Sequence, residues 1–335
     1  MVLLRTRPSR LRAALLVSAL AATALAGCGD DGSARAGDAG RGGDPSGEVG
    51  RTVAIEHRFG TTRAPVHPER IISLDAQWTD VLVALGAPPV GYIRDPNIEG
   101  GNFPWRGDRL AEATGMTATD ALPWEQITEL DPDLIVVSYF AQDEADYERL
   151  SAIAPTITTL SDGQVDAWQD ITRTAGTVLD YTAGADALIE EVEGSVAALA
   201  EEIPGIEGKT FALVNFVPGD AFYVVSDPKD GAVVLFDQLG LAISPTILDA
   251  GEGVSGRVEL SLEQAELLDV DVLLLLTNGG ETDDIVGYED LPAVRSGAVA
   301  VLDYADASGL NTPSPLSVPY CLDLIRPALE AAAAT

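Results

Sequence analysis

The chain has 335 residues, a formal net charge of −33 and 46% hydrophobic residues. A surface this acidic repels phosphate backbones and anionic lipid head groups, so nucleic acid is excluded as a natural partner. The length is enough for two domains, each with a sizeable apolar core.

The N-terminal segment has the pattern of an export signal. Within residues 1–27, four arginines precede an apolar stretch, which is the arrangement of a signal peptide rather than of a membrane span. The sequence LAGC, which ends at Cys28, resembles a bacterial lipobox. We therefore expect cleavage before Cys28 and lipidation of that cysteine, which would hold the protein on the outer face of the cytoplasmic membrane. Residues 28–51 are rich in Gly, Asp, Ser and Arg and predict a flexible linker.

Strand and helix patterns alternate along the rest of the chain, which predicts an α/β fold. After a predicted hairpin at 52–66, the predicted strands are 70–74, 90–92, 134–139, a short one at Thr156, 209–216, 272–277 and 299–302. The predicted helices are 78–85, 147–153, 183–203, 231–239 and 319–334. Residues 97–108 are rich in Gly, Asn and aromatic side chains and predict a loop that extends from a strand end.

The longest helical pattern divides this part of the chain in two. We expect an N-terminal α/β lobe over residues 52–180, an interlobe helix over 181–204 and a C-terminal α/β lobe over 205–335. A single long helix between two lobes would act as a stiff spine, so we expect only a small closing motion when a ligand binds.

A repeated segment indicates that the two lobes are related. Residues 124–138 recur in altered form at 262–277, and the matched pairs are Glu125 with Glu263, Gln126 with Gln264, Leu130 with Leu268, Asp131 with Asp269 and Asp133 with Asp271. Each copy predicts a short amphipathic helix, an acidic turn and a buried parallel strand. Two such lobes would face each other across a cleft. A chance match remains the alternative, because α/β units share patterning without common ancestry.

Motifs for catalysis and metal binding are missing from the sequence. Gly208, Lys209 and Thr210 do not form a phosphate loop, because the motif requires a glycine where Ile203 stands. The chain has only two histidines, His57 and His67, ten residues apart, which argues against a catalytic triad and against a zinc or manganese site. We therefore expect no enzymatic activity, no protein-bound metal and no cofactor. With Cys28 lipidated, Cys321 is the one remaining thiol, so no intramolecular disulfide is expected.

Several segments, taken in order, resemble one family of binding proteins. They are APVHPERIISL at 64–74, VLVALGAPPVG at 81–91, LDPDLI at 130–135 and LSAIAPT at 150–156. Together they resemble the class III substrate-binding proteins of ABC importers, and most closely the iron-siderophore branch. The resemblance implies two Rossmann-like lobes joined by a single long helix, with the ligand cleft between them. It further implies a monomer that passes a ferric siderophore to an ABC importer permease. Haem and cobalamin are alternative cargoes within the same class.

The resemblance also implies site residues, because the family binds its ligand with loops at the carboxyl ends of strands. The ligand-binding residues so implied are Gln77, Trp78, Tyr92, Arg94, Trp105, Arg106, Tyr139 and Phe140 in the first lobe and Phe216, Tyr223, Asn278, Thr312 and Ser314 in the second. The acidic residues that dock such proteins on the permease correspond to Asp80 and Asp237. Few of these positions are basic, so a neutral or cationic hydroxamate complex is favoured over a highly charged catecholate.

Two classes of protein are alternatives to a binding protein. A surface-anchored enzyme of the nitrogenase-cluster type shares the two-lobed plan, but it would need several cysteines to hold its cluster. A structural or adhesive lipoprotein would need no cleft between lobes. Titration with ferric siderophores, haem and cobalamin discriminates among these alternatives.

Overall fold

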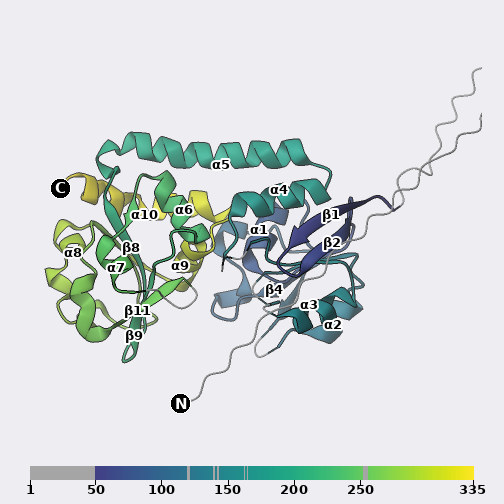
Figure 1. The fold of residues 1–335 in the computed structure, drawn as a ribbon, viewed down its shortest axis with the longest axis horizontal. Coiled ribbons are helices and arrows are strands. Elements are labelled where there is room, and N and C mark those ends of the chain that lie inside the picture. Colours follow the sequence, from purple (N-terminus) through teal and green to yellow (C-terminus); the bar gives the residue numbers. More distant parts are fainter. Residues whose placement is uncertain are drawn as a thin grey trace, which may run out of the picture. The chain divides into compact units, whose positions relative to one another are not determined.

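The computed structural model describes residues 50–335, apart from 119–120, 139, 142, 162, 164 and 252–255. The predicted signal peptide, the predicted lipidation site Cys28 and most of the linker lie outside these residues, as does Tyr139. The described part contains two separate sheets with helices packed around them, together with one hairpin (Figure 1). The α/β fold predicted from the alternating patterns is therefore confirmed.

The first lobe is built on a five-stranded sheet with the order β5-β4-β3-β6-β7, in which all neighbours are parallel. Its strands are β3 (Ile71–Ser73), β4 (Gly91–Arg94), β5 (Thr114–Thr117), β6 (Leu134–Val136) and β7 (Thr156–Ile157). Its helices are α1 (Ala76–Ala84), α2 (Trp124–Glu129), α3 (Glu144–Ser151) and α4 (Trp168–Val178), with short 3-10 turns η1 (Glu99–Gly101) and η2 (Pro104–Arg106). The strands β1 (Thr52–His57) and β2 (Gly60–Pro65) form the predicted hairpin.

Helices cover both faces of this sheet because neighbouring strand residues point to opposite sides. Ile71 belongs to a core formed with α1 and α4, whereas Ile72 belongs to a core on the other face with α2 and α3. The hairpin adds Ile55 and Ala64 to the first of these cores. This arrangement leaves the carboxyl ends of the strands as the edge at which side chains can meet a ligand.

The second lobe is built on a six-stranded sheet with the order β11-β9-β8-β12-β13, in which β10 also pairs with β8. Its strands are β8 (Thr210–Phe216), β9 (Ala221–Val225), β10 (Ala242–Ile243), β11 (Arg257–Ser261), β12 (Val272–Leu276) and β13 (Val299–Leu302). Its helices are α6 (Gly231–Gln238), α7 (Pro245–Asp249), α8 (Pro292–Ser296), α9 (Tyr304–Asn311) and α10 (Ser317–Ala333), with 3-10 turns η3 (Pro204–Ile206), η4 (Leu262–Leu267), η5 (Thr282–Asp284) and η6 (Tyr288–Asp290). Unlike the first sheet it is mixed, because β9 runs antiparallel to both β8 and β11.

The long helix α5 (Thr182–Glu202) lies between the two sheets in sequence (Figure 1). It packs against α4 of the first lobe and against α6 and α10 of the second. Ile189, Val192, Val196 and Leu199 supply its buried face in the core of the second lobe. None of the described helices is both long and apolar enough to cross a membrane.

The repeated segment occupies equivalent places in the two lobes. In each lobe it supplies a strand beside the central one, with β6 next to β3 and β12 next to β8. Asp133 accepts hydrogen bonds from the backbone N–H groups of Glu69 and Arg70 at 2.7 and 3.0 Å, just before β3. Its counterpart Asp271 accepts one from the Thr210 N–H at 2.8 Å, where β8 begins. The two aspartates thus fix the same register in both sheets.

The second copy differs from the prediction in one respect. A short α-helix was expected in both copies, but the second folds as the 3-10 turn η4, in which Gln264 departs from helical geometry. Ser261 and Gln264 form a capping box there, in which the Gln264 side chain accepts a hydrogen bond from the backbone N–H of Ser261 at the end of β11.

Candidate ligand-binding site

The two faces of the second sheet differ in polarity around β8, β9 and β11. On one face Val214, Val224 and Val258 are buried in the core. On the other, Asn215 pairs with Tyr223, and Tyr223 pairs with Glu259, across neighbouring strands. These side chains are partly or fully exposed. Alternation along the strands therefore separates a sealed apolar face from an open face, on which Leu213 and Val225 are also buried but Asn215, Tyr223 and Glu259 have exposed surface.

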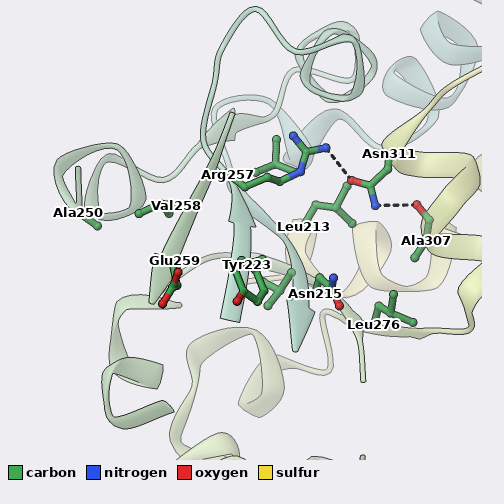
Figure 2. Close-up of a pocket in the computed structure, with 12 residues that line it drawn as sticks. Leu213, Asn215, Tyr223, Ala250, Arg257, Val258, Glu259, Leu276, Ala307 and Asn311 are labelled. Carbon is green, nitrogen blue, oxygen red and sulfur yellow. Dashed lines mark hydrogen bonds between the residues drawn. The ribbon is translucent and has the colours of Figure 1, made fainter. Parts of the chain in front are cut away.

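A cavity of about 760 Å³ lies on the open face. It is lined by Leu213, Val214, Asn215, Tyr223, Val225, Ala250, Arg257, Val258, Glu259, Leu276, Ala307 and Asn311 (Figure 2). Its volume falls within the range of small-molecule sites, and its walls combine apolar side chains with a few polar groups.

Arg257 is held in the wall of the cavity by Asp230 and Asn311, of which Figure 2 shows the contact with Asn311. Its Nη1 lies 2.7 Å from Oδ2 of Asp230, and its Nη2 donates to Oδ1 of Asn311 at 3.1 Å. Asp230 is buried, and its Oδ1 caps α6 by accepting a hydrogen bond from the Ala232 N–H at 2.9 Å. Asn311 is fixed in turn by its own donation to the Ala307 carbonyl at 3.0 Å. The guanidinium group is therefore pre-positioned at the cavity with part of its charge already compensated.

The row of polar side chains on β8 and β9 is also oriented by neighbours. Tyr223 donates its hydroxyl hydrogen to Oδ2 of Asp220 at 2.9 Å. This hydrogen bond raises the pKa of the Tyr223 phenol above its usual range, so the group stays protonated. Asn278, which follows β12 with a φ of 49°, donates to the Phe216 carbonyl at 2.8 Å and to the Asn215 side chain. The amide of Asn278 thus orients Asn215 at the cavity wall.

Tyr223 is the one residue of the set implied by family resemblance that lines this cavity. Five others are partly or fully exposed elsewhere: Arg94, Trp105, Phe140, Asn278 and Thr312. A direct ligand contact for these five stays a prediction. Tyr139 lies outside the described residues.

Trp78 lies in the core of the first lobe, and its role as a ligand anchor stays a prediction. It is 1% exposed and packs with Ile71, Val81 and Leu134 between α1 and the first sheet. Its position just after a strand was correct, but the first turn of α1 directs this side chain toward the sheet.

Asp80, predicted to dock on a permease, is 2% exposed, and its docking role stays a prediction. Its Oδ1 accepts a hydrogen bond from Nε of Arg106 at 2.5 Å, and its Oδ2 accepts one from Nε1 of Trp105 at 2.7 Å. The Ser314 hydroxyl of the second lobe donates to the same Oδ2 at 2.7 Å. Three donors from both lobes therefore enclose this carboxylate. Asp237, on α6, is exposed and remains available.

The same buried cluster contains three further residues whose ligand contact stays a prediction. Arg106 is 1% exposed, and its Nη2 donates a hydrogen bond to the Ala76 carbonyl at 3.0 Å. Ser314 is fully buried. Gln77 is buried as well, and its amide donates to the carbonyls of Asp166 and Pro313 at 3.1 and 2.7 Å. Gln77 and Ser314 thus make hydrogen bonds between the two lobes, whereas the bonds of Arg106 stay within the first lobe.

Tyr92 and Phe216 are also buried, and ligand contact for both stays a prediction. Tyr92 packs with Val83 and Leu110 in a small core of the first lobe. Phe216 packs against Phe222, with ring centroids 5.3 Å apart, on the sealed face of the second sheet. Phe216 ends β8 as expected, whereas Tyr92 is the second residue of β4, which continues to Arg94.

Arg257 and Glu259 line the cavity but were not predicted as site residues, although the sequence carries a signal for them. Arg257, Val258, Glu259, Leu260 and Ser261 alternate between polar and apolar along β11. This alternation is typical of a strand with one open face. Asn215 and Asn311 carry no such signal, because an isolated asparagine is equally common in turns.

Comparison with known proteins identifies the family. A model for the periplasmic binding protein family matches residues 71–305. The chain is 26% identical over 305 residues to a probable siderophore-binding lipoprotein of Bacillus subtilis, covering 82% of this chain and 87% of the relative. It is 27% identical over 313 residues to an Fe(3+)-citrate-binding protein of the same organism, with coverages of 88% and 90%.

Solved structures support the same assignment. The crystal structure of Streptococcus pneumoniae PiaA in complex with ferrichrome has a TM-score of 0.70 and 25% identity to this chain, and the match covers 84% of this chain and 98% of the other. A periplasmic solute-binding protein from Mycobacterium smegmatis gives a TM-score of 0.71 at 25% identity, with coverages of 84% and 99%. The family resemblance seen in the sequence motifs is therefore confirmed, and the chain belongs to the periplasmic binding protein family.

Proposed function

We propose that this protein captures a ferric siderophore outside the cytoplasmic membrane and delivers it to an ABC-type permease for iron uptake. The observation that carries the proposal is the cavity on the open face of β8, β9 and β11. Its polar groups come from Asn215, Tyr223, Arg257, Glu259 and Asn311 and its remaining wall is largely apolar. This is the composition expected for a site that recognises an organic ligand by shape and a few hydrogen bonds.

The donor set supports an iron complex over free iron. The described residues contain no group of three or more His, Cys, Asp or Glu side chains arranged to hold a metal ion. An iron ligand for this cavity would therefore have to bring its own donors, as a siderophore does. The relatives point in the same direction, because one is named as siderophore-binding and a solved neighbour holds ferrichrome.

Membrane attachment and permease docking are further parts of the proposal. Lipidation at Cys28 would keep the receptor beside its transporter, and the linker of residues 28–51 would let it reach the permease. Asp237 is an exposed acid on α6 that could meet a basic surface of the permease. Rim charges of this kind set recognition and association rate more than they set the fold.

A titration of full-length protein in detergent tests the function. Ferric siderophores, haem and cobalamin are added separately while intrinsic fluorescence is recorded, and binding of a ferric siderophore is expected. Arg257→Gln should weaken that binding by about tenfold or more, because a charge-assisted hydrogen bond is worth about 1.5–3 kcal/mol. Arg295→Gln is the matched control, because Arg295 is exposed on α8 and does not line the cavity. Binding of haem or cobalamin alone would reassign the cargo.

A further inference from the structure

The charges around the cavity are mostly negative. Two of its lining residues have charged side chains, Arg257 and Glu259. The guanidinium of Arg257 lies 2.7 Å from the buried carboxylate of Asp230, so its positive charge is largely compensated within the wall. The carboxylate of Glu259 is exposed on the open face, and its charge is therefore directed at an occupant.

The tyrosine beside Glu259 adds to this asymmetry. The Tyr223 hydroxyl hydrogen is used by Asp220 at 2.9 Å, so the oxygen that remains is an acceptor. Asp220 itself is exposed and brings a second carboxylate next to the cavity wall. Glu259 and Tyr223 are direct partners across β11 and β9. This edge of the cavity therefore offers acceptors and negative charge in one place.

Ferric siderophore complexes differ in net charge, so the negative charge at this cavity would discriminate among them. Hydroxamate groups lose one proton each on binding ferric iron, so a trihydroxamate complex is neutral unless it carries another charged group. Catecholate groups lose two protons each, and a tris-catecholate complex is strongly anionic. An anionic complex would meet Glu259 and Asp220 with no uncompensated cation among the lining residues, whereas a pendant ammonium would be attracted.

We propose that this cavity selects its ferric complex by charge, binding a cationic trihydroxamate best, a neutral one next and an anionic complex worst, with Glu259 and Asp220 as the discriminating groups. The inference rests on the proposed function and specifies its ligand class. Asn215 and Asn311 would supply hydrogen bonds to the hydroxamate and amide groups of such a ligand. Each unit of ligand charge should change Kd by roughly twofold to tenfold, the Coulomb scale for partly solvated charges about 8 Å apart.

The experiment uses one chelator in several charge states. A linear ferric trihydroxamate with a free pendant amine is compared with its acetylated and succinylated forms, which carry one positive charge, none and one negative charge around an unchanged iron centre. A ferric tris-catecholate completes the series. Affinities of full-length protein in detergent are measured at low and at physiological salt. We expect the order cationic, neutral, anionic, with differences that shrink as salt screens them.

Two variants show whether the named acid causes the order. Glu259→Gln should reduce the preference for the cationic over the anionic form by roughly threefold. Glu190→Gln, an exposed change on α5 outside the cavity, should leave the preference unchanged. Equal or tighter binding of the anionic forms by wild type, or an unchanged preference in Glu259→Gln, overturns the inference and leaves siderophore capture standing. Binding of none of the ferric chelates overturns siderophore capture itself.

Discussion

Ser314 of the second lobe donates its hydroxyl hydrogen to Oδ2 of Asp80 in the first lobe, at 2.7 Å and out of contact with solvent. Asp80 is at the same time the ion-pair partner of Arg106. One residue before Ser314, the Pro313 carbonyl accepts a hydrogen bond from the Gln77 amide at 2.7 Å. Gln77 and Asp80 of α1 thus form hydrogen bonds to one short segment of the second lobe. These bonds add to the packing of α5 on both lobes.

Removal of the Asp80 carboxylate should destabilise the protein strongly. Asp80→Ala leaves the buried Arg106 guanidinium without its counter-charge, which costs about 3–5 kcal/mol in comparable buried pairs. The free energy of unfolding, measured by urea denaturation, reports the loss. Asp237→Ala is the control, because an exposed acid on α6 should change stability by less than about 0.5 kcal/mol. Equal stability of the two variants would refute the anchoring role of Asp80.

Trp78→Ala should act on folding, because the side chain fills the core between α1 and the first sheet. Truncation of a buried Trp to Ala typically costs about 3–5 kcal/mol. The loss should appear as a lower midpoint of unfolding in ligand-free protein, while any folded fraction binds ligand with wild-type Kd. A variant of wild-type stability with weakened binding would instead restore Trp78 as a ligand contact.

The stability of the β1–β2 hairpin should depend on pH through His57. This ring is buried between Thr62, whose Oγ1 lies 2.9 Å from Nε2, and Thr158, whose Oγ1 lies 3.1 Å from Nδ1. Burial lowers the pKa of His57 below its ordinary value. The folded state therefore favours the neutral ring, and this contribution is fully present above about pH 6.5 and is lost as pH falls toward the folded-state pKa.

The measurement compares thermal unfolding of wild type and His57→Gln from pH 7.5 to pH 5. The difference between the two proteins isolates His57 from other titrating groups. The comparison is needed because Asp75 also titrates in this range, since burial raises its pKa to about 6. A carboxyl group whose pKa is raised on folding stabilises the folded state at low pH, and this contribution is lost as pH rises through the folded-state pKa. We expect the wild-type advantage to shrink on acidification. A difference that stays constant across this range would show that His57 is not a linked titrating group.

Lipidation can be tested independently of the fold. Cys28→Ala removes the thiol that would carry the lipid, so the protein should no longer partition into detergent with membranes. Metabolic labelling with a fatty-acid analogue reports attachment directly, and Cys321→Ala is the matched control because that thiol is buried. Label that persists on the Cys28→Ala protein would disprove the assignment.

The fold was largely predictable because its signals are local. Continuous apolar runs predict strands such as β12, whose five residues are all buried. The repeat placed Asp133 and Asp271 in equivalent positions, and the structure assigns them the same register-setting hydrogen bonds. The antiparallel strand β9 was not predicted, because its pairing with β8 and β11 depends on contacts between segments distant from its own sequence.

The site was harder to predict because motif position does not give side-chain direction. Strand ends were located correctly, yet Trp78 and Phe216 point into cores and Asp80 faces an arginine. A carboxylate on a short helix looks the same in sequence whether it meets solvent or a buried guanidinium. By contrast, the alternation of Arg257, Val258 and Glu259 distinguishes the two faces of β11 directly.

The open and sealed faces of β8, β9 and β11 also bear on how such a receptor can change its cargo over evolution. Side chains such as Tyr223 and Glu259 can be exchanged without altering Val224 and Val258, which lie on the opposite side of the same strands. A substitution on the open face therefore leaves core packing intact. Natural selection can retune ligand preference by point substitution on this scaffold while the capacity to fold is inherited unchanged.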